Sequence, residues 1–171
     1  MKNYKEIDGF SAMEEQGELF KIICKKGMRV AEVGVYKGRM SMMIMQMFDR
    51  KLEYFCVDHF GGSAEHEKKD YLPEFLENTS RSGVRVCVGE STDVAKWFDD
   101  NYFDIVYLDA SHDYLSVKED IAAWLPKVKK GGVLCGDDYV RGWDGVIQAV
   151  DEAFGDNVRI AGKQQWWVVK E

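Results

Sequence analysis

The sequence lacks any run of about 18 apolar residues, so no segment predicts a membrane-spanning helix. It has only 2 prolines, and no internal repeat or low-complexity stretch marks a linker between domains. The opening residues, MKNYKEIDGF, are polar and lack the apolar core of a signal peptide. We therefore expect residues 1–171 to form a single cytoplasmic domain, with residues 1–27 as an N-terminal helical segment.

A basic run is also missing. Lys and Arg number 23 against 30 Asp and Glu, which gives a formal net charge of −7. Nucleic acid backbones and anionic lipid surfaces are held chiefly by clustered Lys and Arg. The charge balance therefore argues against nucleic acid and membrane partners, and a small molecule is the expected ligand.

Cysteine is scarce and follows no metal-binding pattern. The four cysteines, Cys24, Cys56, Cys87 and Cys135, show no C-x-x-C spacing, and three of them lie in apolar, strand-like runs. Free cysteines of this kind usually behave as small buried apolar residues. We expect four buried free thiols in a reducing cytoplasm rather than disulfides or a thiolate metal site.

The most informative stretch is VAEVGVYKGRMS, residues Val30–Ser41. It runs from β-favouring residues through two glycines into a helix-like apolar segment. Glycine lets a backbone approach a ligand closely, and the first N–H groups of a helix face that ligand. The spacing differs from the G-x-G-x-x-G of dinucleotide sites, which argues against a dinucleotide oxidoreductase. The acid Glu32 ahead of Gly34 suits a ligand that carries an ammonium and a sulfonium.

Strand-like and helix-like segments alternate along the rest of the chain. The strand-like segments are Met28–Val33, Glu53–Asp58, Val84–Val88, Phe103–Asp109 and Val133–Gly136, followed by Asn157–Ala161 and Gln165–Val169. Alternation predicts an α/β fold with a doubly wound, Rossmann-like parallel sheet. The last two segments flank a glycine turn and predict a C-terminal antiparallel hairpin. In such sheets the ligand lies beyond the carboxyl ends of the strands.

Acids follow four of these strand ends: Asp58, Glu90, Asp109, and the pair Asp137 and Asp138. An acid after the second strand can accept both ribose hydroxyls, although it can equally cap a turn. Three carboxylates in one crevice repel one another unless a cation joins them, and oxygen ligands suit Mg²⁺. Adjacent strand side chains point to opposite faces, so Asp137 and Asp138 share an ion only if the chain leaves the strand there. The alternative is that these acids are solvated caps.

His112 lies three residues after Asp109. Histidine is the side chain best suited to accept a proton near neutral pH. We therefore interpret His112 as a candidate general base, with a structural histidine as the alternative. His59 follows Asp58 and is placed to reach the same ligand, whereas His66 lies in the charged segment Gly61–Asp70 and is expected to be solvated.

Two stretches resemble known families. Glu32–Gly38 resembles motif I, E-x-G-x-x-x-G, of the class I S-adenosylmethionine-dependent methyltransferases. Phe103–Tyr139 resembles the metal-dependent O-methyltransferases of the catechol and macrocin type, in which a strand ends D-x-x-H or D-x-x-K and G-G-x-x-x-x-D-D or D-N follows a helix. The resemblance covers nearly the whole chain. It implies S-adenosylmethionine, Mg²⁺ and O-methylation of a small catechol-like or sugar-like diol.

The resemblance also implies which residues contact the cofactor: Glu32, Gly34, Tyr36, Gly38, Ser41, Asp58, His59, Phe60, Gly89, Glu90, Ser91 and Asp109. The first residues of this set would line the methionine part of S-adenosylmethionine, and Asp58 would take the ribose. Glu90 and Ser91 would flank the adenine, with Phe60 as an apolar wall. The sequence departs from the family at position 40, where Ser or Thr is common and this chain has Met40, with Ser41 one position later. The resemblance therefore does not imply a contact between the Ser41 hydroxyl and the cofactor carboxylate.

The implied metal ligands are Asp109, Asp137 and Asp138, and the implied general base is His112, where the catechol type has lysine. Two alternatives stay open. One is a metal-independent methyltransferase, in which the same acids only cap turns and chelators have no effect. The other is a non-catalytic S-adenosylmethionine-binding protein. The N-terminal extension is short, so a homodimer is one way to cover the acceptor.

Overall fold

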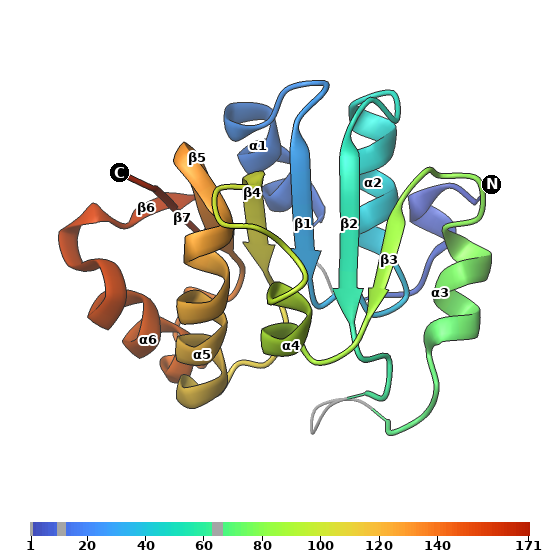
Figure 1. The fold of residues 1–171 in the computed structure, drawn as a ribbon. Helices are drawn as coiled ribbons and strands as arrows, with labels where there is room; N and C mark the ends of the chain where they lie inside the picture. The colour runs from blue at the N-terminus through green and yellow to red at the C-terminus, as the bar shows by residue number, and fades with distance from the viewer. Residues whose placement is uncertain (1, 10–12, 63–66) are drawn as a thin grey trace.

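The computed structural model describes residues 2–9, 13–62 and 67–171, and His66 lies outside them (Figure 1). Seven strands form one sheet in the order β3-β2-β1-β4-β5-β7-β6. The strands are β1 Arg29–Val33, β2 Glu53–Asp58, β3 Arg85–Val88, β4 Phe103–Leu108, β5 Val128–Gly136, β6 Arg159–Ala161 and β7 Gln165–Val169. Strands β1 to β5 pair in parallel, while β7 pairs antiparallel with both β5 and β6. The predicted parallel sheet with a C-terminal antiparallel hairpin is confirmed.

Helices cover both faces of the sheet. The α-helices are α1 Met13–Ile23, α2 Arg39–Met47, α3 Leu72–Asn78, α4 Ser91–Ala95, α5 Tyr114–Trp124 and α6 Asp144–Phe154, and the 3₁₀ turns are η1 Tyr4–Glu6, η2 Leu125–Lys127 and η3 Gly155–Asn157. Helices α1 and α2 lie on one face, and α4, α5 and α6 lie on the other (Figure 1). This is the doubly wound arrangement that the alternation predicts.

The two faces have separate apolar cores. Along β1, Val30 packs with α1 and α2, whereas Ala31 and Val33 pack with α4, α5 and α6. Burial of each of the two valine side chains contributes about 1.5–3 kcal/mol. Glu32 lies between Ala31 and Val33 in the strand, on the face that α1 and α2 cover, and is almost completely buried. A charged residue in the middle of a strand that is buried on both faces is costly without partners, which marks Glu32 for a role beyond packing.

Strand β5 begins earlier than expected. The glycine pair Gly131-Gly132 predicts a start at Val133, but the strand runs from Val128. Val128 pairs with Phe103, and the register then shifts so that Val133 pairs with Ile105. The residues between bulge out of the ladder, and the glycines allow the chain to bulge instead of stopping the strand.

The expectations about cysteine and membrane spans can be compared with the structure. All four cysteines are free and buried, as predicted. Burial raises the pKa of the Cys24 thiol to about 12, which keeps it in the unreactive protonated form. No helix among the described residues is long and apolar enough to cross a membrane.

Candidate cofactor pocket and catalytic group

A cavity of about 580 Å³ opens where the carboxyl ends of β1 to β5 meet. Pockets for small ligands span roughly 300–1,000 Å³, so the cavity can hold a nucleoside-sized molecule. It lies where the order of strands reverses beside β1, as expected for this fold. The predicted residues that line it are Glu32, Gly34, Tyr36, Asp58, His59, Phe60, Gly89, Glu90, Ser91, Asp109, His112, Asp137 and Asp138.

Gly34 lets the turn after β1 press against the end of β4. Its φ is +86°, and a Cβ at this position would lie 2.0 Å from the backbone oxygen of Asp109. The Asp109 amide donates to the Val33 carbonyl at 2.8 Å, which holds the two strand ends together. Only glycine permits this approach, and the approach brings the expected cofactor turn and Asp109 to one point of the cavity.

Asp58 braces the same turn. Its Oδ2 accepts hydrogen bonds from the amides of Val35 and Tyr36, both at 2.9 Å, and Oδ1 accepts one from the amide of Phe60 at 2.7 Å. A carboxylate offers about four acceptor positions, so three are engaged. These contacts are the ones expected if Asp58 caps a turn, which was the alternative to binding ribose. Asp58 lines the cavity as well, and its contact with ribose stays a prediction.

Gly38 and Ser41 do not line the cavity. Gly38 caps the start of α2 at φ +84°, and a Cβ there would meet Thr79 at 2.8 Å and Phe75 at 3.0 Å. Ser41 is fully buried, and its hydroxyl donates to Oε2 of Glu32 at 2.5 Å. The structure therefore places Ser41 behind Glu32, where it supports a residue of the cavity wall.

Glu32 is the buried acid at the bottom of the cavity. Tyr54 also donates to its Oε2, at 2.8 Å. Burial raises the pKa of Glu32 to about 7, although the hydrogen bonds from Ser41 and Tyr54 favour the ionised form. The carboxyl is therefore poised between its two forms near neutral pH, and a bound cationic group would favour the carboxylate.

Glu32→Gln is expected to increase stability relative to wild type above neutral pH. The folded protein holds the Glu32 proton up to pH about 7, whereas the ordinary pKa of a glutamate is 4.5, so wild type loses stability as pH rises across that window. This difference corresponds to about 3 kcal/mol. Urea denaturation should show the stability gap between variant and wild type widening from about pH 4 to about pH 8. An identical gap at both pH values would contradict the assignment.

Asp109, His112 and Asp138 form the candidate catalytic group. One ligand atom from each lies within 4.8 Å of the others. Nε2 of His112 is 2.8 Å from Oδ2 of Asp138, and both side chains are mostly enclosed. The His112 ring also stacks on Trp143, with ring centroids 4.2 Å apart. An imidazole held by a carboxylate and an aromatic ring is well positioned to exchange a proton.

The structure does not bring Asp137 into this group. Its carboxylate instead accepts hydrogen bonds from the amides of Gln16 at 2.8 Å and of Gln164 and Gln165, both at 2.6 Å. The chain leaves β5 at Asp138, where φ is +62°, and the carboxylate of Asp138 accepts from Gln164 at 3.3 Å through Oδ1 and meets His112 through Oδ2. The adjacent acids therefore share Gln164 but differ in their other partners, and Asp137 anchors the turn that presents Asp138 by accepting from the Asp138 amide at 2.8 Å. No pattern in the sequence predicts a role for these three glutamines.

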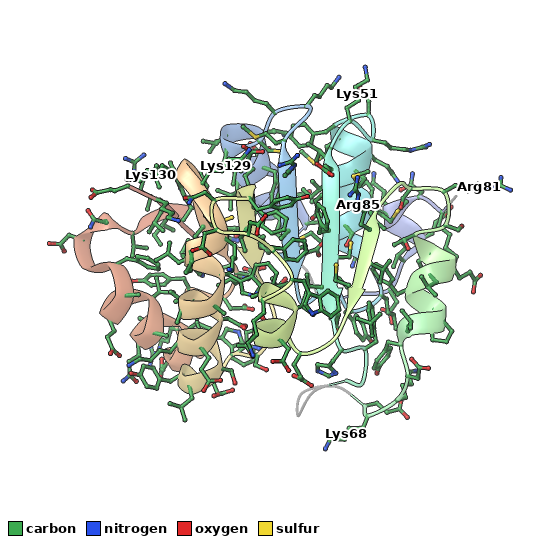
Figure 2. The ribbon with its side chains drawn as sticks, in the orientation of Figure 1. Lys51, Lys68, Arg81, Arg85, Lys129 and Lys130 are labelled. Atoms are coloured by element: carbon green, nitrogen blue, oxygen red, sulfur yellow. The ribbon has the colours of Figure 1, made fainter. Side chains whose placement is uncertain are left out.

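The cavity wall is strongly acidic. Its acids are Glu32, Asp58, Glu90, Asp109, Glu119, Asp120, Asp137 and Asp138, and the only described cations that line it are Lys37 and Arg39. Lys37 is already paired with Asp8 at 3.0 Å and Glu74 at 3.1 Å. Figure 2 shows Lys51, Lys129 and Lys130 at the opposite end of the sheet. Such a field favours a cationic ligand over a pyrophosphate.

The doubly wound sheet, the glycine turn and the acidic cavity define a class I S-adenosylmethionine-dependent methyltransferase. A family model described as a methyltransferase domain matches residues 31–139, from β1 to the end of the Asp137-Asp138 turn. The chain therefore belongs to this methyltransferase-domain family. The match includes all residues of the catalytic group.

Solved structures show the same fold. The chain is similar to a SAM-dependent O-methyltransferase from Thermotoga maritima, at 13% identity and a TM-score of 0.70, over 95% of this chain and 67% of that one. Cofactor-bound Rv0187 from MTB is similar at 16% identity and a TM-score of 0.73, over 97% of this chain and 84% of that one. CalS11, a TDP-rhamnose 3'-O-methyltransferase, is similar at 15% identity and a TM-score of 0.65, over 92% of this chain and 77% of that one. Comparison with curated protein sequences gave no match.

Proposed function

We propose that the protein transfers the methyl group of S-adenosylmethionine to a hydroxyl oxygen of a small catechol-like or sugar-like diol. The observation that carries this proposal is the contact between the Gly34 turn and Asp109, which shares its group with His112 and Asp138. The expected cofactor site and a candidate proton acceptor therefore meet in one cavity. Similarity to structures described as O-methyltransferases supports oxygen as the acceptor atom.

The donor set fits a divalent cation such as Mg²⁺. Asp109 and Asp138 supply two carboxylates on one side of the cavity, and Mg²⁺ is commonly bound by one or two carboxylates and several waters. We propose that these two residues hold the ion and that Asp137 supports Asp138 from behind. A metal held by these residues would lower the pKa of the acceptor hydroxyl and would orient a chelating diol.

Different residues of the chain would position the cofactor and accept the proton. Glu32 and the Gly34 turn would position the sulfonium for in-line displacement, in which alignment supplies much of the rate. The acceptor hydroxyl would lose its proton to the imidazole of His112, which Asp138 holds in place through Nε2. The oxygen–carbon bond forms as the carbon–sulfur bond breaks. The products are a methyl ether, S-adenosylhomocysteine and one proton, which His112 returns to solvent.

Calorimetric titration of S-adenosylmethionine into the purified protein tests the cofactor, with and without Mg²⁺. Micromolar binding is expected, while NAD as the control ligand should not bind because the cavity wall is acidic. Absence of S-adenosylmethionine binding under both conditions would contradict the proposal.

Release of S-adenosylhomocysteine with catechol and with a methyl glycoside that carries a vicinal diol then tests the reaction. Activity that survives a chelator would favour the metal-independent alternative. Binding without turnover on any acceptor would favour the non-catalytic one.

The setting of the enzyme is part of the proposal. Four buried free thiols support a reducing, cytoplasmic location. We propose that residues 1–171 act as one domain on a small-molecule acceptor, without nucleic acid or membrane, and that a homodimer completes the acceptor side. Light scattering of the purified protein would show whether its mass is that of a homodimer.

A further inference from the structure

Residues 2–9 run along helix α2 from its end to its start. At the end of α2, Nε2 of Gln46 donates to the backbone oxygen of Lys2 at 3.3 Å. At the start of α2, Nη1 of Arg39 donates to the backbone oxygen of Gly9 at 2.8 Å. Figure 1 shows this N-terminal segment beside α2 and α3. We call residues 2–9 the N-terminal strap, because they span a helix whose first residues line the cavity.

The last residue of the strap forms part of the cavity wall. Gly9 lines the cavity together with Lys37 and Arg39, which lie on either side of Gly38 in the cofactor turn. A Cβ at Gly9 would lie 3.2 Å from Cδ of Arg39 and 3.3 Å from its Cβ, so the strap is packed closely against this side chain. The strap therefore closes the cavity on the side where α2 begins.

A lysine of the cofactor turn fastens the strap. Nζ of Lys37 is 3.0 Å from Asp8 of the strap and 3.1 Å from Glu74 of α3, so two carboxylates share one ammonium. The Lys37 side chain is 10% exposed, whereas that of Asp8 is 75% exposed. The hydrogen bond and the charge of Lys37 hold the pKa of Asp8 below its ordinary value, so the pair is charged at neutral pH. An ion pair with one partner in open solvent is weak and is screened by salt.

The strap is anchored away from the cavity and lightly held beside it. Its first residue, Lys2, donates to Oδ1 of Asn78 at 2.7 Å, and Ile7 is buried. The two residues that follow Ile7 carry the polar contacts to the cofactor turn, and neither of them is buried. Backbone with few buried apolar contacts opens at a lower cost than the core. The strap can therefore open beside the cavity while Ile7 stays in place.

Closure of the strap has a cost at Arg39. Its Nε is fully enclosed and has no hydrogen-bond partner among the described residues, although Nη1 is bonded to Gly9. Gly9 packs against Cδ, which is the carbon bonded to this nitrogen. A buried donor without a partner is unfavourable, and water satisfies it when Gly9 moves away. The closed strap is thus held by a weak ion pair and opposed by an unsatisfied donor, as expected of a segment that opens repeatedly.

We propose that the strap closes the cavity at the cofactor turn and opens at Asp8 and Gly9 to let the cofactor enter and its demethylated product leave. This inference rests on the proposed function, because it assumes that the cavity exchanges these two ligands. The ion pair between Asp8 and Lys37 is the latch. A latch that is equally strong in the free and the ligand-bound protein changes the rates of entry and exit by the same factor. It therefore sets how fast the ligand exchanges and leaves the affinity unchanged.

Asp8→Asn removes the charge of the latch at an exposed side chain, so the variant is expected to fold as wild type does. Stopped-flow fluorescence measures association and dissociation of S-adenosylhomocysteine, with Trp143 in the cavity wall as the reporter. Both rates should rise about twofold or more, the size expected for an exposed ion pair, while the Kd from calorimetry stays at the wild-type value. Raising the salt concentration from about 50 mM to about 500 mM should accelerate both rates in wild type and have less effect in the variant.

Glu74→Gln is the matched control. It removes the same charge from the other carboxylate that pairs with Lys37, but this carboxylate belongs to α3 and not to the strap. The latch at Asp8 stays intact, and Lys37 then pairs with Asp8 alone. Both exchange rates should therefore stay at or below the wild-type values.

The outcomes separate this inference from the proposed function. If wild type does not bind S-adenosylhomocysteine, the proposed function fails, and this inference fails with it. If wild type binds the ligand but Asp8→Asn leaves both rates unchanged, only the inference is overturned. It is also overturned if faster dissociation in Asp8→Asn comes with an equal loss of affinity, since Asp8 would then support the binding site. An equal acceleration in Glu74→Gln would overturn it too, because the charge on Lys37 and not the strap would be the cause.

Discussion

His112→Ala is expected to lower turnover about a hundredfold or more while S-adenosylmethionine affinity stays unchanged. General base catalysis contributes roughly 10²–10⁴ in rate, and alanine leaves no group to accept the proton. The imidazole lies 2.8 Å from Asp138 and stacks on Trp143, so the loss is of a positioned base and not of a mobile surface residue. S-adenosylhomocysteine release under saturating cofactor measures the rate, and calorimetry measures the affinity. Unchanged turnover would remove His112 from the mechanism.

His59→Ala is the matched control for this experiment. His59 also lines the cavity, but it follows β2 and not β4. Its loss is expected to change cofactor affinity and not the rate at saturating cofactor. A rate loss of the same size in both variants would mean that the His112 effect is a general disturbance of the cavity.

A Mg²⁺ titration separates two roles for His112, because its nitrogen lies in the same group as the carboxylates of Asp109 and Asp138. If His112 is the base, the half-saturating Mg²⁺ concentration for residual activity stays at the wild-type value in His112→Ala. If it is a metal ligand, that concentration rises. Asp109→Ala provides the reference, since we expect it to remove the dependence on Mg²⁺ altogether.

The strand ends were predictable because their cause is local. Strand β2 spans Glu53–Asp58 as predicted, since its apolar run ends abruptly at an acid. Parallel strands then bring residues such as Asp58 and Asp109 to one edge without any knowledge of side-chain contacts. For the same reason most residues that were predicted from the turns line the cavity, while their contacts with a cofactor stay predictions.

The orientation of side chains was not predictable in this way. The pattern places Asp137 and Asp138 together after β5, but their partners decide where each one points. Gln16 lies 121 positions away from Asp137 in the chain, and no local pattern links the two. Ser41 was likewise assigned by its position in the turn, whereas its hydroxyl is taken by Glu32.

Asp120 did leave a signal in the sequence. It stands three residues after Val117 and four before Trp124, which places an acid on the apolar stripe of a helix. An acid in that position is either a local error of the pattern or a functional residue. The contacts of Asp120 with Ser91 and the cavity show that the exception to the pattern lies at the site.

Gly34→Ala is expected to destabilise the fold by more than about 3 kcal/mol, the range of severe backbone and packing defects. The added Cβ would lie 2.0 Å from the Asp109 oxygen and 2.7 Å from the Ala110 Cα. All these neighbours are backbone atoms between paired strands, so no side chain can move aside. Relief requires β1 and β4 to separate at their carboxyl ends, and the variant should lose S-adenosylhomocysteine binding as well.

Gly27→Ala separates this clash from backbone strain. Gly27 has φ +91°, close to the +86° of Gly34, but a Cβ there meets nothing within 4 Å. Its replacement should therefore cost only the strain of the left-handed conformation, about 1–2 kcal/mol. The difference between the two variants in urea denaturation measures the contact with Asp109. Equal losses would mean that this contact is relieved cheaply and that the cofactor turn is not held against the catalytic group.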